Sequence, residues 1–270
     1  AWRAEACLER ARAAIHDALR EARHEPPGAT VWGRMDRVVA ESPALAGMDC
    51  ALQMRAAGAA LDLNAADEET LRRLFVGLGR SPAGADSLAD ALADWRDEDD
   101  EPRPSGAEAA WYRAGGLPLP RNGPFADVRE LARVRGFDAL PAIDTLLSAE
   151  PGRVPLTHGS PAVLAALPGL GPEAAARLME MRLRGDRVAE LAAFTGNLSA
   201  TGREEAHRRF PELTGAVVTE PDAWIVTGRG VVGSPPAVSP RWVEAPSTST
   251  APPRARALSR AAAALDSSRP

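Results

Sequence analysis

The sequence has 270 residues, of which 45% are hydrophobic and 26% charged, enough for one large globular domain or two modest ones. Its formal net charge of -5 disfavours nucleic acid as a partner, because non-specific affinity for a polyanion comes from clustered basic residues. Cysteine occurs only at Cys7 and Cys50, which excludes a disulfide-dense scaffold and a four-cysteine zinc site.

No stretch approaches the ~20 apolar residues that a membrane-spanning helix needs, and no signal peptide precedes Ala1. The chain also begins without methionine. Two interpretations stay open: a trimmed cytoplasmic protein, or a protein from which an upstream targeting or membrane helix has been removed.

The first predicted element is an amphipathic helix from Trp2 to Arg23. Its apolar residues recur at helical spacing and comprise Leu8, Ala11, Ile15 and Leu19. Pro26 and Pro27 end it. Short runs around Thr30–Trp32 and Cys50–Met54 then predict strands, with a turn at Gly58.

The middle of the chain predicts an all-α block with two helix-hairpin-helix units. In the first unit, Asn64 is expected to cap a helix that begins at Ala65. A turn at Gly77–Gly79 then leads into the partner helix, Ser87–Trp95. In the second, the corresponding segments are Ser160–Leu167, Pro168–Gly171 and Pro172–Arg184. A further helical stretch is expected near Val128–Val134.

After Pro211 the sequence becomes rich in β-branched residues. The predicted strands are Ala216–Thr219, Ala223–Thr227, Val231–Val232 and Trp242–Val243. From Ala245 onward the Pro, Ser, Thr, Ala and Arg content predicts a flexible tail without a fold. These elements predict an α+β fold in which a helical domain is inserted into a small sheet-containing unit.

The predicted domains follow this division. They are a helix with the first strands at 1–62, the inserted α-domain at 63–212, the completing strands at 213–244 and the tail at 245–270.

Three stretches of the helical block carry a family resemblance. They read LDLNAADEETL from Leu61, DWRDEDDEPRPSGAE from Asp94 and NGPFADVREL from Asn122. Together they resemble the K-type minor pseudopilin of type II secretion, and the part from Asp94 to Leu131 is the most specific. The resemblance extends from about Arg3 to about Val232.

The resemblance implies a structural role without enzymatic chemistry. It implies a pseudopilin fold, in which an N-terminal amphipathic helix packs on a small antiparallel sheet, interrupted by a large α-domain with helix-hairpin-helix (SAM-like) units. It also implies bound calcium and exposure at the periplasmic face of the inner membrane. It also implies assembly with the I-type and J-type minor pseudopilins at the pseudopilus tip. Two departures stand out: the transmembrane half of the pilin helix is absent, and Pro155–Pro161 replaces the usual entry to the second hairpin.

Carboxylates crowd the segment Asp94–Glu108, called the acidic loop here, and such density needs either water or a cation to limit repulsion. The residues Asp97, Asp99, Glu101 and Glu108 fall at positions one, three, five and twelve of an EF-hand register. Pro102 occupies the position that requires glycine, so the loop is not an EF-hand.

We therefore predict a calcium site in the acidic loop, with the alternative of a solvated acidic run left open. Gly106 would let the chain turn so that the last carboxylate closes on the others. The predicted ligands are Asp97, Asp99, Asp100 and Glu108. Asp94 is interpreted as a helix-end residue rather than a ligand.

The rival function is a DNA-binding module of the competence type. The turn Pro168–Gly171 has the form that presents backbone N–H groups to a phosphate, and Arg177 and Arg182 would add positive charge. The acidic residues Glu173, Glu180 and Asp186 flank the same unit and argue against it.

An enzyme is not expected, because the four histidines lack metal-ligand spacing and no nucleophile elbow or phosphate loop accompanies them. Trp95, Trp111 and Tyr112 are interpreted as packing around the acidic loop. For Cys7, a disulfide with Cys50 and a buried free thiol remain equally open.

Overall fold

The computed structural model describes residues 2–22, 31–42, 50–140, 142–230, 237–244 and 255–256. The chain divides into two compact units, unit 1 with residues 1–55 and 223–270, and unit 2 with residues 56–222. Within the described residues, no helix has the length and apolar character required to cross a membrane.

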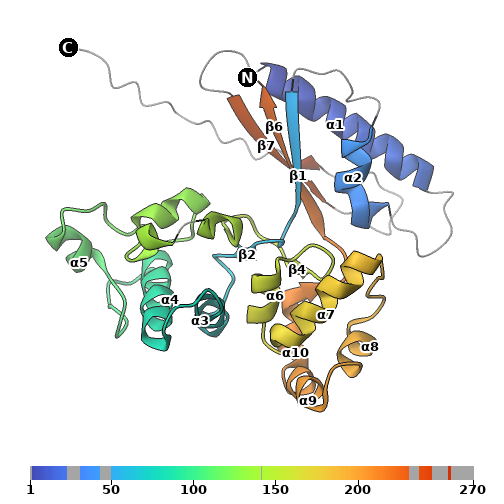
Figure 1. The fold of residues 1–270 in the computed structure, drawn as a ribbon. Helices are drawn as coiled ribbons and strands as arrows, with labels where there is room; N and C mark the ends of the chain where they lie inside the picture. The colour runs from blue at the N-terminus through green and yellow to red at the C-terminus, as the bar shows by residue number, and fades with distance from the viewer. Residues whose placement is uncertain are drawn as a thin grey trace, which may run out of the picture. The chain divides into compact units, whose positions relative to one another are not determined.

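Unit 1 combines helices with one sheet (Figure 1). Its helical elements are α1 (Trp2–Glu21), the 3-10 turn η2 (Trp32–Arg34) and α2 (Met35–Ala40). Its strands are β1 (Cys50–Ala56), β6 (Ala223–Gly230), β7 (Ala237–Glu244) and β8 (Ala255–Arg256). The sheet order is β1-β6-β7-β8, and β6 and β7 pair antiparallel.

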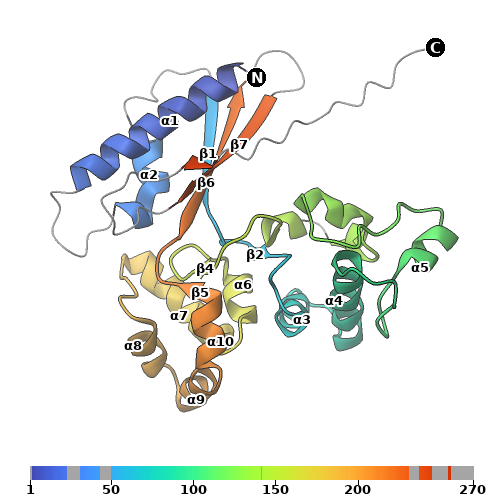
Figure 2. The same cartoon turned by 180° about the vertical axis from the view of Figure 1, so that it is seen from behind.

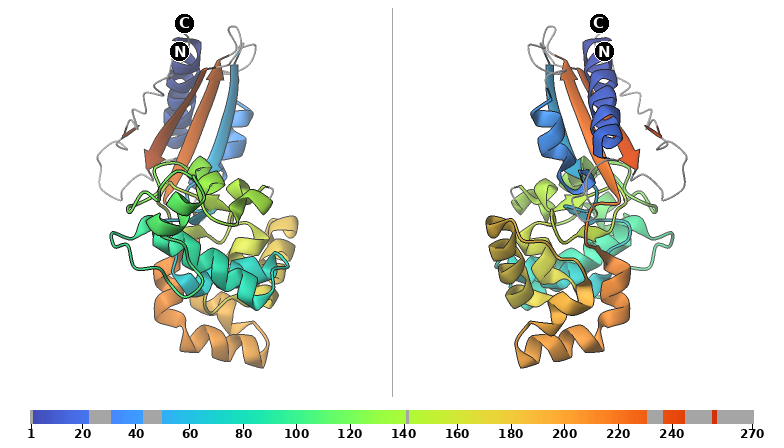
Figure 3. Two further views of the ribbon diagram at one scale, coloured as in Figure 1. Left: turned by 90° about the vertical axis from the view of Figure 1, so that its left-hand side faces the viewer. Right: turned by 90° about the vertical axis from the view of Figure 1, so that its right-hand side faces the viewer.

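The long helix α1 runs along this sheet and packs against β6 and β7 (Figure 3). Its predicted stripe faces inward, since Leu8, Ala11 and Ile15 are all buried. Burial of such a stripe gives an amphipathic helix most of its stability. Cys7 on the same helix is buried and disulfide-bonded, and Cys50 is the only other cysteine in the sequence.

The predicted strand at Thr30–Trp32 is wrong over its described part, because Trp32 begins η2 and leads into α2. The buried residues Trp32, Met35 and Val39 recur at helical spacing, which a short β-branched run did not indicate. At the other end, β8 pairs with β7 inside the segment predicted to have no fold. Residues 231–232 and the remainder of the predicted tail lie outside the described residues.

Unit 2 is predominantly helical (Figure 2). Its α-helices are α3 (Glu68–Gly77), α4 (Pro82–Arg96), α5 (Ala109–Ala114), α6 (Pro161–Ala166), α7 (Gly171–Arg184), α8 (Leu191–Gly196), α9 (Ala200–Arg208) and α10 (Phe210–Ala216). The 3-10 turns are η4 (Val128–Arg133), η5 (Phe137–Ala139) and η6 (Ile143–Thr145). Helices α3 and α4 pack together, as do α6 and α7, and α3 also contacts α6.

The start of α3 differs from the prediction that Asn64 caps a helix from Ala65. The cap is Asp67, whose Oδ1 accepts a hydrogen bond from the backbone N–H of Thr70 at 2.7 Å. Asn64 instead binds a segment that is distant in the sequence. Its side-chain oxygen accepts a hydrogen bond from the backbone N–H of Phe125 at 2.7 Å, and its side-chain amide donates one to the backbone carbonyl of Phe125 at 3.1 Å. An aspartate followed by two glutamates is the better N-terminus, because acidic groups favour the positive end of a helix.

The second helix pair lies where its helices were predicted. Ser160 caps α6 by accepting from the backbone N–H of Val163 at 3.2 Å, and Pro161 is its first residue. Gly169 and Gly171 in the turn have φ values of +81° and +71°, a backbone conformation that side chains disfavour.

One segment, residues 146–156, joins the beginning and the end of unit 2, and we call it the bridge segment. Near the beginning, β2 (Leu61–Asp62) pairs parallel with β3 (Leu147–Ser148). Near the end, β5 (Val217–Val218) pairs parallel with β4 (Val154–Pro155). The chain crosses itself closely here, because a Cβ atom added at Gly58 would lie 2.0 Å from the carbonyl oxygen of Arg153.

Candidate metal centre

Two helix ends bring three carboxylates of the acidic loop together. Asp94 belongs to the last turn of α4, Asp97 is the C-cap of that helix, and Glu108 is the N-cap of α5. One ligand oxygen of each of these three residues lies within 4.8 Å of the other two. Asp94 is 0% and Glu108 3% exposed, so two of the three carboxylates are removed from water.

Three oxygens of this cluster lack a hydrogen-bond partner among the described residues. They are Oδ1 of Asp97 and both Oε atoms of Glu108, and all are buried. A buried carboxylate oxygen without a donor is costly, and proteins pair such groups or coordinate a metal with them. The donor set consists of oxygen atoms, which suit hard divalent cations such as calcium or magnesium.

The electrostatics of the cluster favour binding of a cation. Burial, reinforced by the negative charges of Asp94 and Asp97, raises the pKa of Glu108 to about 7. Burial also raises the pKa of Asp94, although hydrogen bonds from Arg103 oppose that shift. A divalent cation would favour the ionised forms that this environment disfavours.

The structure brings together two of the four predicted ligands, Asp97 and Glu108. Asp99 and Asp100 are exposed and lie outside the cluster. An Oδ1 of Asp99 accepts from the backbone N–H of Glu101 at 2.9 Å, and Oδ1 of Asp100 accepts from the Asn122 side chain at 3.0 Å. Their environment is that of a solvated acidic run, whereas the environment of the buried carboxylates is not.

Asp94 enters the cluster although its sequence position favoured a helix-end role. The signal that could have identified it is its spacing from Leu88, Ala91 and Trp95, which places it on a buried part of α4. A carboxylate at such a position needs a partner.

The neighbourhood of Asp94 is tight. A Cβ atom at Gly106 would lie 2.0 Å from Oδ2 of Asp94, so glycine is required by this close approach and not by a positive φ. The loop is also held by Asp90, which accepts from the backbone N–H of Ser105 at 3.1 Å, and by Arg135, which donates to the carbonyl of Gly106 at 2.7 Å.

The aromatic residues form a packed shell beside the cluster. Trp95 and Tyr112 are buried and meet edge to face with ring centroids 5.4 Å apart. Trp111 is instead 42% exposed, and the guanidinium of Arg135 lies 5.1 Å from its ring centroid.

The second helix pair gives the DNA-binding alternative no support. Arg182 is half-buried, and its Nη2 donates to the backbone carbonyl of Leu156 at 2.7 Å, so this guanidinium is engaged inside the protein. Burial lowers the pKa of Arg182 to about 10. Of the two arginines expected to add positive charge, only Arg177 is exposed, and Glu173 lies one helical turn away.

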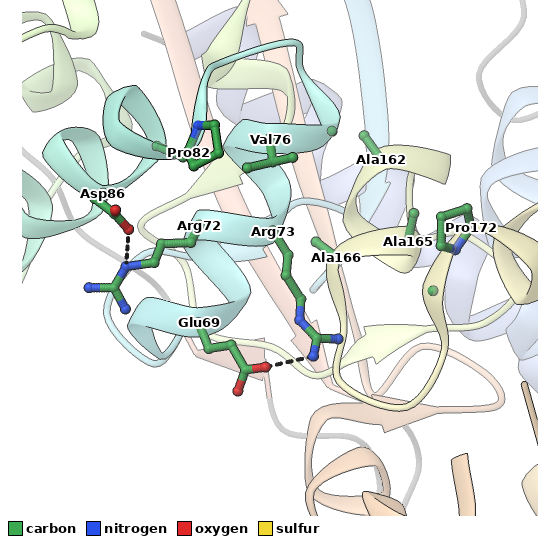
Figure 4. A pocket seen from close by; sticks show the side chains of 13 residues that line it. Glu69, Arg72, Arg73, Val76, Pro82, Asp86, Ala162, Ala165, Ala166 and Pro172 are labelled. Atoms are coloured by element: carbon green, nitrogen blue, oxygen red, sulfur yellow. Dashed lines mark hydrogen bonds and ion pairs between the residues drawn. The ribbon is translucent and has the colours of Figure 1, made fainter. Parts of the chain in front are cut away.

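A pocket of about 650 Å³ lies between the two helix pairs of unit 2. Its walls carry small apolar residues, and Figure 4 shows Arg72 paired with Asp86 and Arg73 with Glu69 at its edge. Because these cations are already neutralised, the pocket does not present free positive charge to a phosphate.

Part of the chain is similar to a known protein family. Residues 51–143 match the family described as "Type II secretion system (T2SS), protein K". Type II secretion system protein K of Dickeya chrysanthemi is 42% identical over 71 residues, which cover 26% of this chain and 19% of that protein. The matched segment is thus a small part of the relative's length.

A solved structure shares the fold at low sequence identity. It is described as the GspK-GspI-GspJ complex from the enterotoxigenic Escherichia coli Type 2 Secretion System. The matching chain is 17% identical with a TM-score of 0.54, and the match covers 73% of this chain and 75% of that one. The mixed arrangement of helices and a small sheet is therefore common to both.

Proposed function

We propose that this chain, whose residues 51–143 match the family described as "Type II secretion system (T2SS), protein K", is a structural minor pseudopilin of the pseudopilus tip. The family match confirms the resemblance drawn from the acidic loop, and it is the observation that carries the proposal. In this role unit 1 is the pilin-like body, and unit 2 is the inserted helical domain with its two hairpin units.

The proposed partners are the I-type and J-type minor pseudopilins. The structure that shares this fold is described as a complex of K, I and J components, which supports the same partners here. The proposed location is the periplasmic face of the inner membrane, with anchoring through a helix upstream of Ala1. A tip subunit of this kind acts through assembly and shape, and we propose no catalytic chemistry.

Co-purification tests this role directly. We expect the chain to form a stable complex with the I-type and J-type pseudopilins of the same secretion system during size-exclusion chromatography. Unit 2 without unit 1 is the matched control and should not enter the complex, because the pilin-like body is proposed to make the contact. Absence of any complex with the full chain would contradict the proposal.

We further propose that the acidic loop binds calcium through Asp94, Asp97 and Glu108. The support is the cluster of three carboxylates with three buried, unpartnered oxygens. Calcium accepts six to eight oxygen ligands, so backbone carbonyls and water would complete the shell. Asp99 and Asp100 lie outside this cluster, and their role as ligands stays a prediction. Bound calcium would neutralise the cluster and hold the loop in one conformation.

Thermal unfolding with and without calcium tests this site. At ~100 times its dissociation constant, an ion that binds only the folded state adds about 2.7 kcal/mol. At this size that raises the melting temperature by about 5 to 10 °C relative to chelator. Asp97→Asn should abolish the shift, whereas Glu98→Gln, which alters an exposed neighbouring carboxylate, should retain it.

The double variant Asp99→Asn with Asp100→Asn separates the two ligand sets. Retention of the calcium shift would restrict the site to the buried cluster, and its loss would establish the exposed aspartates as ligands. If the wild-type protein shows no shift, the acidic loop is only solvated and the calcium proposal is wrong.

A further inference from the structure

Arg103 is the cation that the acidic loop itself contributes to the cluster. Its Nε donates to Oε1 of Glu68 on α3 at 3.0 Å, and its Nη1 donates to Oδ1 of Asp94 at 3.0 Å. The same Nη1 also donates to Oδ2 of Asp97. One guanidinium thus joins α3, the last turn of α4 and the loop that follows it.

The backbone of Arg103 adds a further contact. Its N–H lies 3.3 Å from each Oδ atom of Asp94, so the same residue reaches this carboxylate through its side chain and its main chain. The Asp94 side chain is 0% exposed, and the Arg103 side chain is 32% exposed. Arg103 is therefore the nearest source of positive charge for a carboxylate that has no access to water.

Arg103 contacts only one of the two carboxylate oxygens of Asp97. Oδ2 is held by the guanidinium, while Oδ1 is buried without a partner among the described residues. The neighbouring Glu108 oxygens also lack donors there and receive no contact from Arg103. The guanidinium thus neutralises one side of the cluster and leaves the other side to a second cation.

We infer that Arg103 is a resident counter-ion that holds Asp94 and Asp97 in place when no calcium is bound. This inference rests on the proposed calcium site. It goes beyond that site because it gives a stabilising role to Arg103, which is not a calcium ligand. Arg103 and calcium both neutralise Asp94 and Asp97, so each one compensates partly for loss of the other at these two carboxylates.

This role makes a prediction that a simple structural arginine does not share. Without the guanidinium, the metal-free protein keeps a buried carboxylate that has lost its charge partner, and such a loss is strongly destabilising. With calcium bound, the ion supplies positive charge at the same place. The cost of removing Arg103 should therefore depend on calcium.

The experiment measures the melting temperature of the full chain and of Arg103→Met in excess chelator and in millimolar calcium. We expect Arg103→Met to lower it by roughly 6 to 20 °C in chelator and by less than half as much in calcium. Arg103→Lys, which keeps the charge but not the fork of donors, should lie between wild type and Arg103→Met in chelator. It also keeps the test usable if Arg103→Met does not fold.

Arg182→Met is the matched control, because this half-buried arginine of α7 binds the backbone carbonyl of Leu156 and not the acidic loop. Its loss of melting temperature should be the same in chelator and in calcium. If Arg103→Met and Arg103→Lys behave like this control while calcium stabilises the wild type, the counter-ion role is wrong and the calcium site stands. If calcium does not stabilise the wild type, both proposals are wrong.

Discussion

At the scale of single residues, Glu108 links the acidic loop to pH. Its two oxygens are buried without partners among the described residues, and burial raises its pKa to about 7 from an ordinary value of 4.5. The folded metal-free protein therefore binds this proton more tightly than the unfolded chain does. Its contribution to stability is complete below pH 4.5 and is lost as the pH rises through 7.

We predict that metal-free protein loses stability between pH 5 and pH 8, and that Glu108→Gln removes most of this dependence. Denaturant unfolding of calcium-stripped protein at the two pH values measures it. Glu98→Gln serves as the control, because that carboxylate is exposed. An equal pH dependence in wild type and Glu108→Gln would contradict the assignment.

The composition of the cluster could be predicted from sequence only in part. The acidic loop identified Asp97 and Glu108, because a turn was expected to return the last carboxylate to the first ones. Sequence spacing could not distinguish the exposed Asp99 and Asp100 from the buried Asp94. That distinction depends on how α4 packs and on the space that Gly106 leaves beside Asp94.

At the scale of elements, strongly periodic helices and tight turns were predictable, and helix starts were less so. The helix α1, the strand β1 and the second helix pair occur where periodicity and caps indicated. The start of α3 was misassigned because Asn64 and Asp67 are both good caps. Asn64 makes a tertiary contact with Phe125 instead, which local sequence does not reveal.

A comparison of Gly58 with Gly79 predicts how much alanine at each position destabilises the protein. Gly58 has a φ of +73°, and an added Cβ atom would lie 2.0 Å from the carbonyl oxygen of Arg153. Gly79 has a φ of +84° with no atom within 4 Å of an added Cβ, so it isolates the conformational cost alone. We expect Gly79→Ala to cost about 1 kcal/mol and Gly58→Ala to cost more, about 3 kcal/mol.

Denaturant unfolding of the two variants checks this difference. If both lose the same free energy of unfolding, the crossing of Gly58 with Arg153 is not as close as the structure describes.

At the scale of the whole molecule, the alternation of helix, strand, helical block and strand indicated that residues far apart must share one sheet. The pairing of β1, β6 and β7 in one sheet agrees with that expectation. The predicted domain boundaries at 62 and 213 remain predictions, and the compact units divide after Arg55 and before Ala223. The bridge segment could not be predicted from sequence, because its two-residue strands are too short to carry a periodic pattern.

The bridge segment affects how force would pass through unit 2 when the chain is pulled or pushed. Both ends of unit 2 are fastened to it, through Leu61 paired with Leu147 and through Val217 paired with Val154. An ion pair between Arg153 and Asp222 adds a third link, with Nε and Oδ2 3.0 Å apart. Tension entering unit 2 at one end can leave at the other through these short ladders. The helices and the acidic loop are not part of these ladders.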